Sequence, residues 1–189
     1  DEEKEMVIDF GIRILFGEMP KILILFIIGF LFGIGWYTLI LFFLLSIYRG
    51  ATGGFHLKTH LGCMLTTTIL YLSPIALAKI SNFQVEYIKY IFIGITLIMS
   101  IIFIKKYAPA DTENIPILSK KERKSKKIKA YIYVVALLML SLFIKDNVFS
   151  YMLIYGIFLQ NLTITPFAYT LTKCKHGFEV YTNESEIIS

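Results

Sequence analysis

Three long stretches of this sequence contain no charged residue. Asp, Glu, Lys and Arg are absent from residues 22–48, 59–78 and 147–172, although they make up 17% of the 189 residues. About 20 consecutive apolar residues are enough to span a bilayer as a helix. A soluble domain of this size has too small a core to bury three such stretches. The pattern therefore predicts an integral membrane protein, and it argues against a soluble enzyme, a disordered chain and a disulfide scaffold.

Hydrophobicity along the chain predicts a single all-α domain, a polytopic membrane helical bundle of about five to six membrane segments. Its expected parts are an interfacial helix at 1–19, a hydrophobic block at 20–48, a loop at 49–62, a helical hairpin at 63–104, a basic loop at 105–129, two last spans at 130–172 and a tail at 173–189. Glycines lie in the middle of the first block, so one long tilted helix and a broken hairpin both fit it.

The N-terminal segment combines charge with an apolar background. Glu5, Asp9 and Arg13 follow one another at steps of four residues, and mostly apolar residues lie between them. This spacing predicts a narrow polar stripe on an otherwise apolar helix. Because the segment is too short and too charged to span a bilayer, we expect it to lie in the membrane interface. Packing against the bundle is the alternative.

The positive charge of the chain is concentrated in one place. Nine of the 19 Lys and Arg residues lie between Lys105 and Lys129. A basic run between apolar spans is typical of a cytoplasmic loop, and anionic membrane lipids are its expected partner rather than nucleic acid. If that loop is cytoplasmic, the alternation of spans also assigns the loop at 49–62 and the tail at 173–189 to the cytoplasmic face.

The loop at 49–62 and the residue that follows it carry the groups best suited to chemistry. The sequence Arg49-Gly-Ala-Thr-Gly-Gly-Phe-His-Leu-Lys-Thr-His-Leu-Gly-Cys63 holds two of the three histidines, one of the two cysteines and four glycines. A thiol becomes a nucleophile when a neighbouring base or cation lowers its pKa from about 8.5. Imidazole can serve as that base near neutral pH.

The spacing alone leaves the partner of the thiol open. On a continuous helix His60 is one turn from Cys63, whereas His56 is two turns away, roughly 10 Å along the axis. A contact between His56 and Cys63 requires the chain to bend, which the glycines of the loop would allow. The three side chains could also form an open zinc site. A packing cysteine with interfacial histidines is the alternative without chemistry.

Two segments together resemble the AgrB (accessory gene regulator B) family, membrane cysteine endopeptidases that process quorum-sensing pro-peptides. The first contains Arg49 and the run Gly54-Phe-His56, followed seven residues later by Cys63. The second, at 107–116, reads Tyr-Ala-Pro-Ala-Asp-Thr-Glu-Asn-Ile-Pro and precedes the basic run. The order of hydrophobic blocks fits the family over nearly the whole chain.

The resemblance implies that His56 and Cys63 are the catalytic pair, with Arg49 and Gly54 as supporting or substrate-binding positions. His60 lies outside the family pattern. The implied substrate is an AgrD-like pro-peptide, which is cleaved through a thioester on the enzyme and cyclised to a thiolactone, an autoinducing peptide. No cofactor and no metal are implied. The expected setting is a bacterial cell membrane, with a homodimer and a catalytic loop at the cytoplasmic face.

Two other classes of function fit the residues. A small membrane transporter or channel would use the glycine-rich first block and the polar groups of the last span, among them Gln160 and Asn161. A membrane zinc hydrolase would use His56, His60 and Cys63 as metal ligands. If the chain is a peptidase, the backbone N–H groups at 53–54 or those at 62–63 are the candidate oxyanion donors, and the sequence does not identify a particular one.

Overall fold

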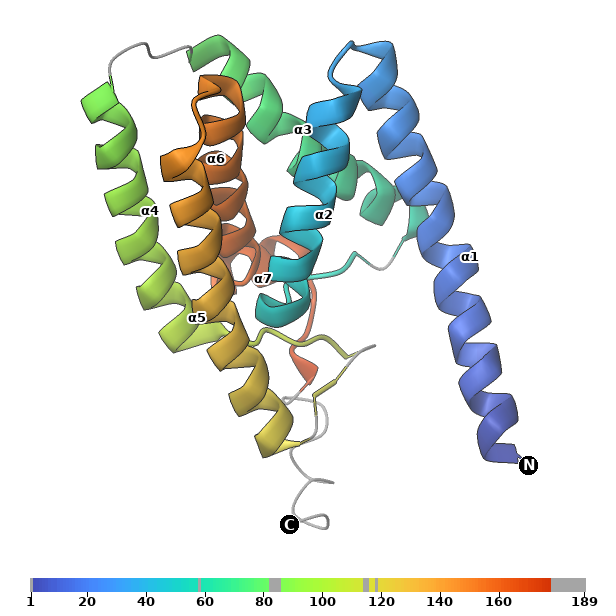
Figure 1. Cartoon of the computed structure of the whole chain (residues 1–189). Coiled ribbons are helices and arrows are strands. Elements are labelled where there is room, and N and C mark those ends of the chain that lie inside the picture. The colour runs from blue at the N-terminus through green and yellow to red at the C-terminus, as the bar shows by residue number, and fades with distance from the viewer. Residues whose placement is uncertain (1, 58, 82–85, 114–115, 118, 178–189) are drawn as a thin grey trace.

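The computed structural model describes the chain apart from residues 1, 58, 82–85, 114–115, 118 and 178–189, and it describes side chains except at 2–16 and 86. The elements of this part are α1 (Glu2–Leu31), α2 (Gly35–Thr52), α3 (His60–Ser81), α4 (Glu86–Tyr107), α5 (Lys120–Phe143), α6 (Asn147–Thr163) and α7 (Pro166–Thr172) (Figure 1). Strands are absent from these residues, and an isolated parallel bridge joins Gly53 to Ala110. The expected all-α architecture is confirmed.

The expected number of membrane spans is not confirmed. Within the described residues, two helices are long and apolar enough to cross a bilayer, His60–Ser81 and Tyr87–Tyr107. Helices α6 and α7 are bent by 69° at their junction and would make a third span if they count as one. The expected five to six segments are therefore not confirmed, because α6 is short and α5 carries much of its length as basic sequence.

The first hydrophobic block forms a helical hairpin. The chain reverses at Gly33, which adopts a positive φ of 69° and has open space around it. Close packing within the hairpin also needs a small residue at position 29, where a Cβ would lie 2.6 Å from Oγ1 of Thr38 on α2. The two helices then pack against each other. Of the two alternatives for this block, the structure has the broken hairpin.

Helix α1 contains both the expected interfacial segment and the start of the first block. It continues through Pro20, so no helix boundary separates residues 1–19 from those that follow. In Figure 1 the N-terminal half of α1 extends away from the other helices. The side chains of Glu5, Asp9 and Arg13 lie outside the described part, so the polar stripe stays a prediction.

The basic segment is only partly a loop. Helix α5 begins at Lys120, because Oγ of Ser119 accepts a hydrogen bond from the backbone N–H of Glu122 (3.4 Å). The sequence Ser-Lys-Lys-Glu has the spacing of a capping box, which favours a helix start at this point. The second half of the expected loop at 105–129 is therefore helical.

Helix α6 lies at the centre of the bundle and packs against α2, α3, α4 and α5. Its position depends on Gly156, where a Cβ would lie 2.8 Å from Cδ1 of Leu45 on α2. Polar side chains, among them Gln160 and Asn161, are buried at its C-terminal end. Helices α3 and α4 instead expose large apolar side chains, as a surface facing lipid would. Examples are Leu65, Ile69, Ile91, Ile95 and Ile98.

Candidate active site

The loop between α2 and α3 begins with two glycines in backbone conformations that other residues rarely adopt. Gly53 has φ of 74° and Gly54 has φ of 141°. Space is restricted as well. A Cβ at Gly53 would lie 2.0 Å from the carbonyl oxygen of Ala110, and one at Gly54 would lie 2.7 Å from Oγ1 of Thr163. Both positions therefore require glycine, and they turn the chain sharply at the end of α2.

Ala110, in the second segment of the resemblance, packs directly on this turn. Gly54 donates its N–H to the carbonyl of Ala110 (3.0 Å), and Ala110 donates its own to the carbonyl of Thr52 (2.8 Å). The peptide bond between Ala108 and Pro109 is cis. Two segments more than fifty residues apart in the sequence thus form one short backbone pairing at the end of the bundle.

Arg49 ties the loop to the central helix. Its Nη2 donates to the carbonyl oxygen of Phe55 (2.9 Å), and its Nη1 donates to Oε1 of Gln160 (3.0 Å). Gln160 in turn donates through Nε2 to the carbonyl of Gly53 (2.8 Å). These bonds hold the backbone on either side of the glycine turn against α6. Arg49 therefore fixes the position of Phe55, the residue before His56.

The bend brings His56, and not His60, to the cysteine. Cys63 lies in the first turn of α3, where its N–H bonds to the carbonyl of Thr59 (3.0 Å). The Sγ atom of Cys63 is 3.9 Å from Nδ1 of His56. His60 begins α3, is exposed, and has its ring 3.8 Å from where a Cβ of Gly17 on α1 would lie. Loop geometry therefore outweighs the one-turn spacing.

The environment of His56 favours the neutral imidazole. Burial, and then the positive charge of Arg49, lower the pKa of His56 to about 4; Glu18 partly opposes this shift and Lys21 adds to it. At pH 7 the ring is therefore uncharged, and one of its nitrogens has a lone pair free to accept a proton. The side chain is suited to act as a base towards the adjacent thiol.

A small, partly open pocket lies beside the cysteine. Its cavity volume is about 20 Å³, roughly enough for one water molecule. Its walls are mixed polar and apolar, with a guanidinium at one side and hydroxyl groups of α3 at another. The lining residues are Arg49, Phe55, Leu57, Cys63, Thr66, Thr67, Leu70 and Thr163. Cys63 lines this pocket, so a carbonyl group of a peptide lying across its mouth would come close to Sγ of Cys63.

The backbone groups expected to stabilise an oxyanion already have partners. Gly53 donates to the carbonyl of Arg49 (2.7 Å) and Gly54 to that of Ala110 (3.0 Å). The N–H of Gly62 bonds to Oγ1 of Thr59 (3.2 Å), which caps the start of α3. That of Cys63 is used within the same turn. These four groups build the loop, so an oxyanion would need a different donor.

Gln160 and Asn161 have structural hydrogen bonds. Asn161 accepts from the hydroxyl of Tyr48 (2.6 Å) and donates to Oγ of Ser100 (2.6 Å). Together with the bonds of Gln160 to Arg49 and the turn, these contacts join α2, α4 and α6 deep in the bundle. The polar part of the last span is therefore used for packing between helices.

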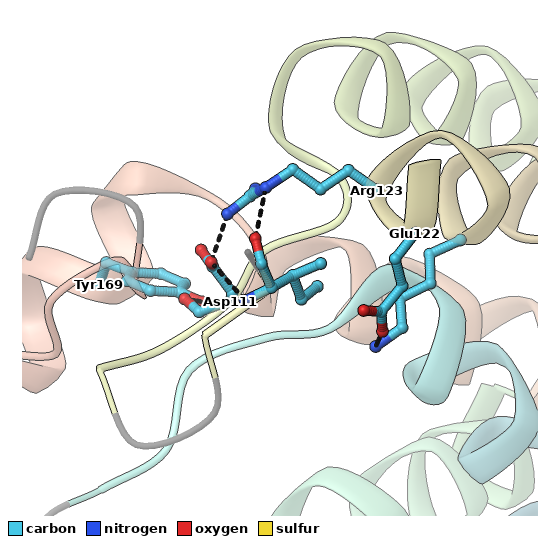
Figure 2. Close-up of polar contacts among 6 residues, drawn as sticks. Asp111, Glu122, Arg123 and Tyr169 are labelled. Carbon is cyan, nitrogen blue, oxygen red and sulfur yellow. Dashed lines mark hydrogen bonds and ion pairs between the residues drawn. The ribbon is translucent and has the colours of Figure 1, made fainter. Parts of the chain in front are cut away.

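A second polar cluster lies after Ala110 (Figure 2). Asp111 is buried and its Oδ2 accepts from a guanidinium nitrogen of Arg123 and from the N–H of Ile117 (3.1 Å). Its carbonyl accepts from the hydroxyl of Tyr169 on α7 (2.9 Å). Figure 2 also shows Glu122, whose carboxylate pairs with Lys126 one turn along α5 (3.2 Å). The cluster fixes Asp111, and with it the backbone next to Ala110, between α5 and α7.

Two ion pairs near the site, four charged residues in all, have no clear sequence signal. Glu18 and Lys21 on α1 form an ion pair (2.5 Å) and both act electrostatically on His56. Asp111 belongs to the matching segment, but its partner Arg123 is twelve residues away. The i, i+3 spacing of the first pair is common on helices, and only the hairpin formed by α1 and α2 brings the pair to the loop.

No group of three His, Cys, Asp or Glu side chains that could hold a metal ion occurs in the described part of the chain. The zinc hydrolase alternative needs His56, His60 and Cys63 to converge. The structure brings together only two of them, His56 and Cys63.

Comparison with known proteins identifies relatives along most of the chain. The family Accessory gene regulator B matches residues 1–164. An AgrB-like protein of Clostridium perfringens strain SM101 is 37% identical over 131 residues, 68% of this chain and 60% of that protein. FsrB of Enterococcus faecalis is 28% identical over 82% of this chain and 62% of its own length. An AgrB-like protein of Listeria welshimeri is 27% identical over 96% of this chain and 87% of its own.

The aligned region thus spans about three fifths of the Clostridium protein. No solved structure matches this chain. The family match includes the glycine turn, the adjacent His56 and Cys63, and Ala110, which packs on the turn. The chain belongs to the AgrB family of accessory gene regulators, which act in quorum sensing.

Proposed function

We propose that this protein is a membrane cysteine endopeptidase that cleaves an AgrD-like pro-peptide and closes its N-terminal product into a thiolactone. The observation that carries the proposal is the approach of Sγ of Cys63 to Nδ1 of a buried, neutral His56, at 3.9 Å. A thiol beside an uncharged imidazole, with a pocket on its open side, is the arrangement that nucleophilic acyl transfer needs.

In the first step His56 accepts the proton of Cys63 at Nδ1, and the thiolate attacks a carbonyl carbon of the pro-peptide. The C–N bond then breaks, and the imidazolium returns the proton to the leaving amine. The products are a free C-terminal peptide and a thioester between Cys63 and the N-terminal part of the substrate. The distance of 3.9 Å is long for a proton transfer, so the pair would tighten when substrate binds.

In the second step a thiol of the bound peptide displaces Cys63. His56 takes the proton of that thiol, its sulfur bonds to the acyl carbon, and the leaving thiolate of Cys63 recovers the proton. One thioester replaces another, so the activated bond is conserved, whereas hydrolysis would lose it. The reaction therefore requires that water be kept from the thioester while the internal thiol is held close. The loop packed under Ala110 supports such shielding.

Arg49 and Gly54 act as supporting residues in this proposal. Arg49 positions the backbone ahead of His56 and also lines the pocket, so its guanidinium could bind a carbonyl or carboxylate of the peptide. Gly54 allows Arg49 to approach, since a Cβ there would lie 3.1 Å from Nη1 of Arg49. Both roles keep the reactive pair aligned without taking part in bond breaking.

The proposed setting is a bacterial cell membrane with the site at the cytoplasmic face. The basic start of α5 supports this orientation, because positively charged segments next to apolar helices remain on the cytoplasmic side. A pro-peptide with an amphipathic helix could reach the site along the membrane plane. The homodimer expected for the family is part of the same proposal.

The test is co-expression of the full chain with its pro-peptide, with peptide masses as the readout. Cys63→Ala and His56→Ala should abolish cleavage, while His60→Ala should retain it. Loss of cleavage in all three variants would contradict a Cys/His dyad. Cleavage by Cys63→Ala at a tenth of the wild-type rate or more would exclude Cys63 as the nucleophile.

A further inference from the structure

The proposed acyl transfer needs hydrogen-bond donors for the oxygen of the attacked carbonyl group. When a thiolate adds to a carbonyl carbon, that oxygen becomes negatively charged, and donors already in place stabilise it. The backbone N–H groups of Gly53, Gly54, Gly62 and Cys63 are bonded within the loop and the first turn of α3. Side chains that line the pocket beside Cys63 are therefore the next candidates.

This pocket has the size and the lining of a site for a single oxygen atom. Its volume of about 20 Å³ admits one water-sized group, so the carbonyl oxygen of a peptide fits, whereas a large side chain does not. Phe55, Leu57 and Leu70 form the apolar part of the wall. In such surroundings a hydrogen bond to a negative charge is stronger than it is in water.

Helix α3 contributes two hydroxyl groups to the pocket. Thr66 and Thr67 follow Cys63 by three and four residues, so all three side chains lie on one face of the helix. Side chains of a helix lean towards its N-terminus. This direction brings both threonine side chains back towards the turn that carries Cys63.

The hydroxyls of Thr66 and Thr67 are available to a ligand. In the part of the chain that the structure describes, neither hydroxyl has a hydrogen-bond partner. The next residue, Thr68, instead donates to the carbonyl of Met64 (2.9 Å), which is a common bond for a threonine inside a helix. Three consecutive threonines therefore differ, and the two without this bond are the two that line the pocket.

The other polar groups of the pocket are engaged in the network around α6. Arg49 donates to Gln160 (3.0 Å) and to the carbonyl of Phe55 (2.9 Å). Oγ1 of Thr163 donates to the carbonyl of Gln160 (2.7 Å). Among the described residues, the two hydroxyls on α3 have no such bonds, so they can turn towards a substrate oxygen.

We propose that the hydroxyls of Thr66 and Thr67 form the oxyanion hole of Cys63. The inference rests on the proposed function, since it supplies the donors for the same acyl transfer. As the sulfur bonds to the carbonyl carbon, an electron pair of the C=O bond moves to oxygen, and both hydroxyls donate hydrogen bonds to it. They keep their protons throughout. The negative charge leaves the oxygen when the C=O bond re-forms and the C–N bond breaks.

The test compares two reactions of Cys63 that differ in whether an oxyanion forms. p-Nitrophenyl acetate transfers its acetyl group to the thiol through a tetrahedral oxyanion and releases p-nitrophenolate, which is followed by its absorbance. Iodoacetamide alkylates the same thiol by displacement of iodide, without an oxyanion. The full chain in detergent carries Cys174→Ser, so that one thiol remains. Cys63→Ala in the same background gives the rate to subtract.

Thr66→Val and Thr67→Val each replace a hydroxyl by a methyl group of similar size. Each should lower the acetylation rate at pH 7 by about tenfold or more, because loss of one oxyanion donor costs about 10²–10³-fold in acyl transfer. Alkylation should be unchanged. Thr66→Ser and Thr67→Ser should retain most of the acetylation rate, since they keep the hydroxyl.

Thr68→Val is the matched control, because the hydroxyl of Thr68 bonds to Met64 and does not line the pocket. It should leave both reactions unchanged. An equal loss of acetylation and alkylation in the pocket variants would overturn the inference, since it would indicate altered access to the thiol. Unchanged acetylation in Thr66→Val and Thr67→Val would also overturn it, as would an equal loss in Thr68→Val. Thermal unfolding verifies that each variant is folded.

Peptide cleavage by the same variants separates this inference from the proposed function. Slower acetylation in both valine variants supports the oxyanion hole even if the wild-type chain cleaves no pro-peptide, and that second result would contradict the peptidase alone. Normal cleavage by the wild type, with unchanged acetylation in Thr66→Val and Thr67→Val, would overturn the role of the two hydroxyls and leave the peptidase standing.

Discussion

The polar groups around Arg49 and those around Cys63 are neighbours, but they are held in opposite ways. Arg49 and Gln160 make several hydrogen bonds of 2.8–3.0 Å to the loop backbone and to each other. Cys63 and His56 are joined by a single long contact of 3.9 Å. The hydrogen bonds of Arg49 and Gln160 fix the path of the chain. The thiol of Cys63 and the imidazole of His56 keep atoms that can still bond to another group.

This difference indicates how a small membrane bundle can build a reactive site. Buried polar groups must be hydrogen-bonded, and in this chain those bonds are used to define a bent loop that no helix would form by itself. A thiol and an imidazole supported in this way need no strong bonds of their own. They remain available for substrate, and the surrounding network supplies the alignment.

Of the substitutions proposed, Gly53→Ala should most strongly disrupt the loop held by Arg49 and Gln160. Its Cβ would lie 2.0 Å from the carbonyl oxygen of Ala110, and the residue would also be strained at φ of 74°. We expect destabilisation of about 3 kcal/mol or more, since strain and overpacking each cost of order 1–3 kcal/mol. Cleavage of the pro-peptide should fall at least a hundredfold, measured by mass spectrometry.

The matched control for this change is Gly50→Ala, one turn earlier on α2. Nothing lies within 4 Å of a Cβ at Gly50, and alanine favours a helix over glycine. Gly50→Ala should therefore be neutral or slightly stabilising in thermal unfolding. A similar loss from both substitutions would mean that the turn has no special role.

Arg49→Met tests whether the network and the reactive pair are separable. It leaves Oε1 of Gln160 and the carbonyl of Phe55 without their donor, at a cost of about 2–3 kcal/mol in unfolding free energy. Arg49→Lys should recover only part of this, because an ammonium group cannot form the same fork of bonds. Peptide cleavage should fall with stability, while alkylation of Cys63 should change little. A fall in alkylation as large as the fall in peptide cleavage would contradict the separation.

The sequence predicted the all-α fold class, whereas the residue spacing in the 49–62 loop left the partner of Cys63 open and only the family resemblance pointed to His56. The charge-free stretches predict membrane helices because their length is independent of tertiary structure. The contact of His56 with Cys63 instead depends on a turn at Gly53 and Gly54, and this turn depends on Ala110 far along the chain. The spacing of residues within the loop gives no information about the contact between this turn and Ala110.

Long-range charge partners were missed for a related reason. Glu18 and Lys21 act electrostatically on His56 only because α1 and α2 form a hairpin, and one long tilted helix fitted the same residues equally well. Asp111 pairs with Arg123 only because Ser119 caps the start of α5, so that Arg123 lies in the first turn of that helix. The expected span count is not confirmed, and hydropathy along the sequence does not reveal that α6 ends at Thr163 and bends into α7.

Asp111→Asn should lower the unfolding free energy moderately and should have only a small effect on cleavage of the pro-peptide. It removes the charge of a buried carboxylate that pairs with Arg123, and we expect a loss of about 1–3 kcal/mol in unfolding free energy. Glu122→Gln, which breaks the more exposed pair with Lys126, should cost less than about 0.5 kcal/mol. Equal effects in thermal unfolding would show that the cluster in Figure 2 is not what fixes Asp111 and the backbone next to Ala110.

The pH dependence of cleavage tests whether the network around Arg49 affects the pair formed by His56 and Cys63. Burial and Arg49 lower the pKa of His56 to about 4, so the imidazole becomes protonated, and ceases to act as a base, only as pH falls through about 4. The rate should be nearly constant between about pH 5 and 7, whereas a histidine with the usual pKa of 6.5 would be about one-tenth neutral at pH 5.5. Arg49→Met should raise this pKa, so its remaining activity should decline at higher pH than in the wild type. A wild-type rate that halves near pH 6.5 would mean that the network around Arg49 does not tune the reactive pair.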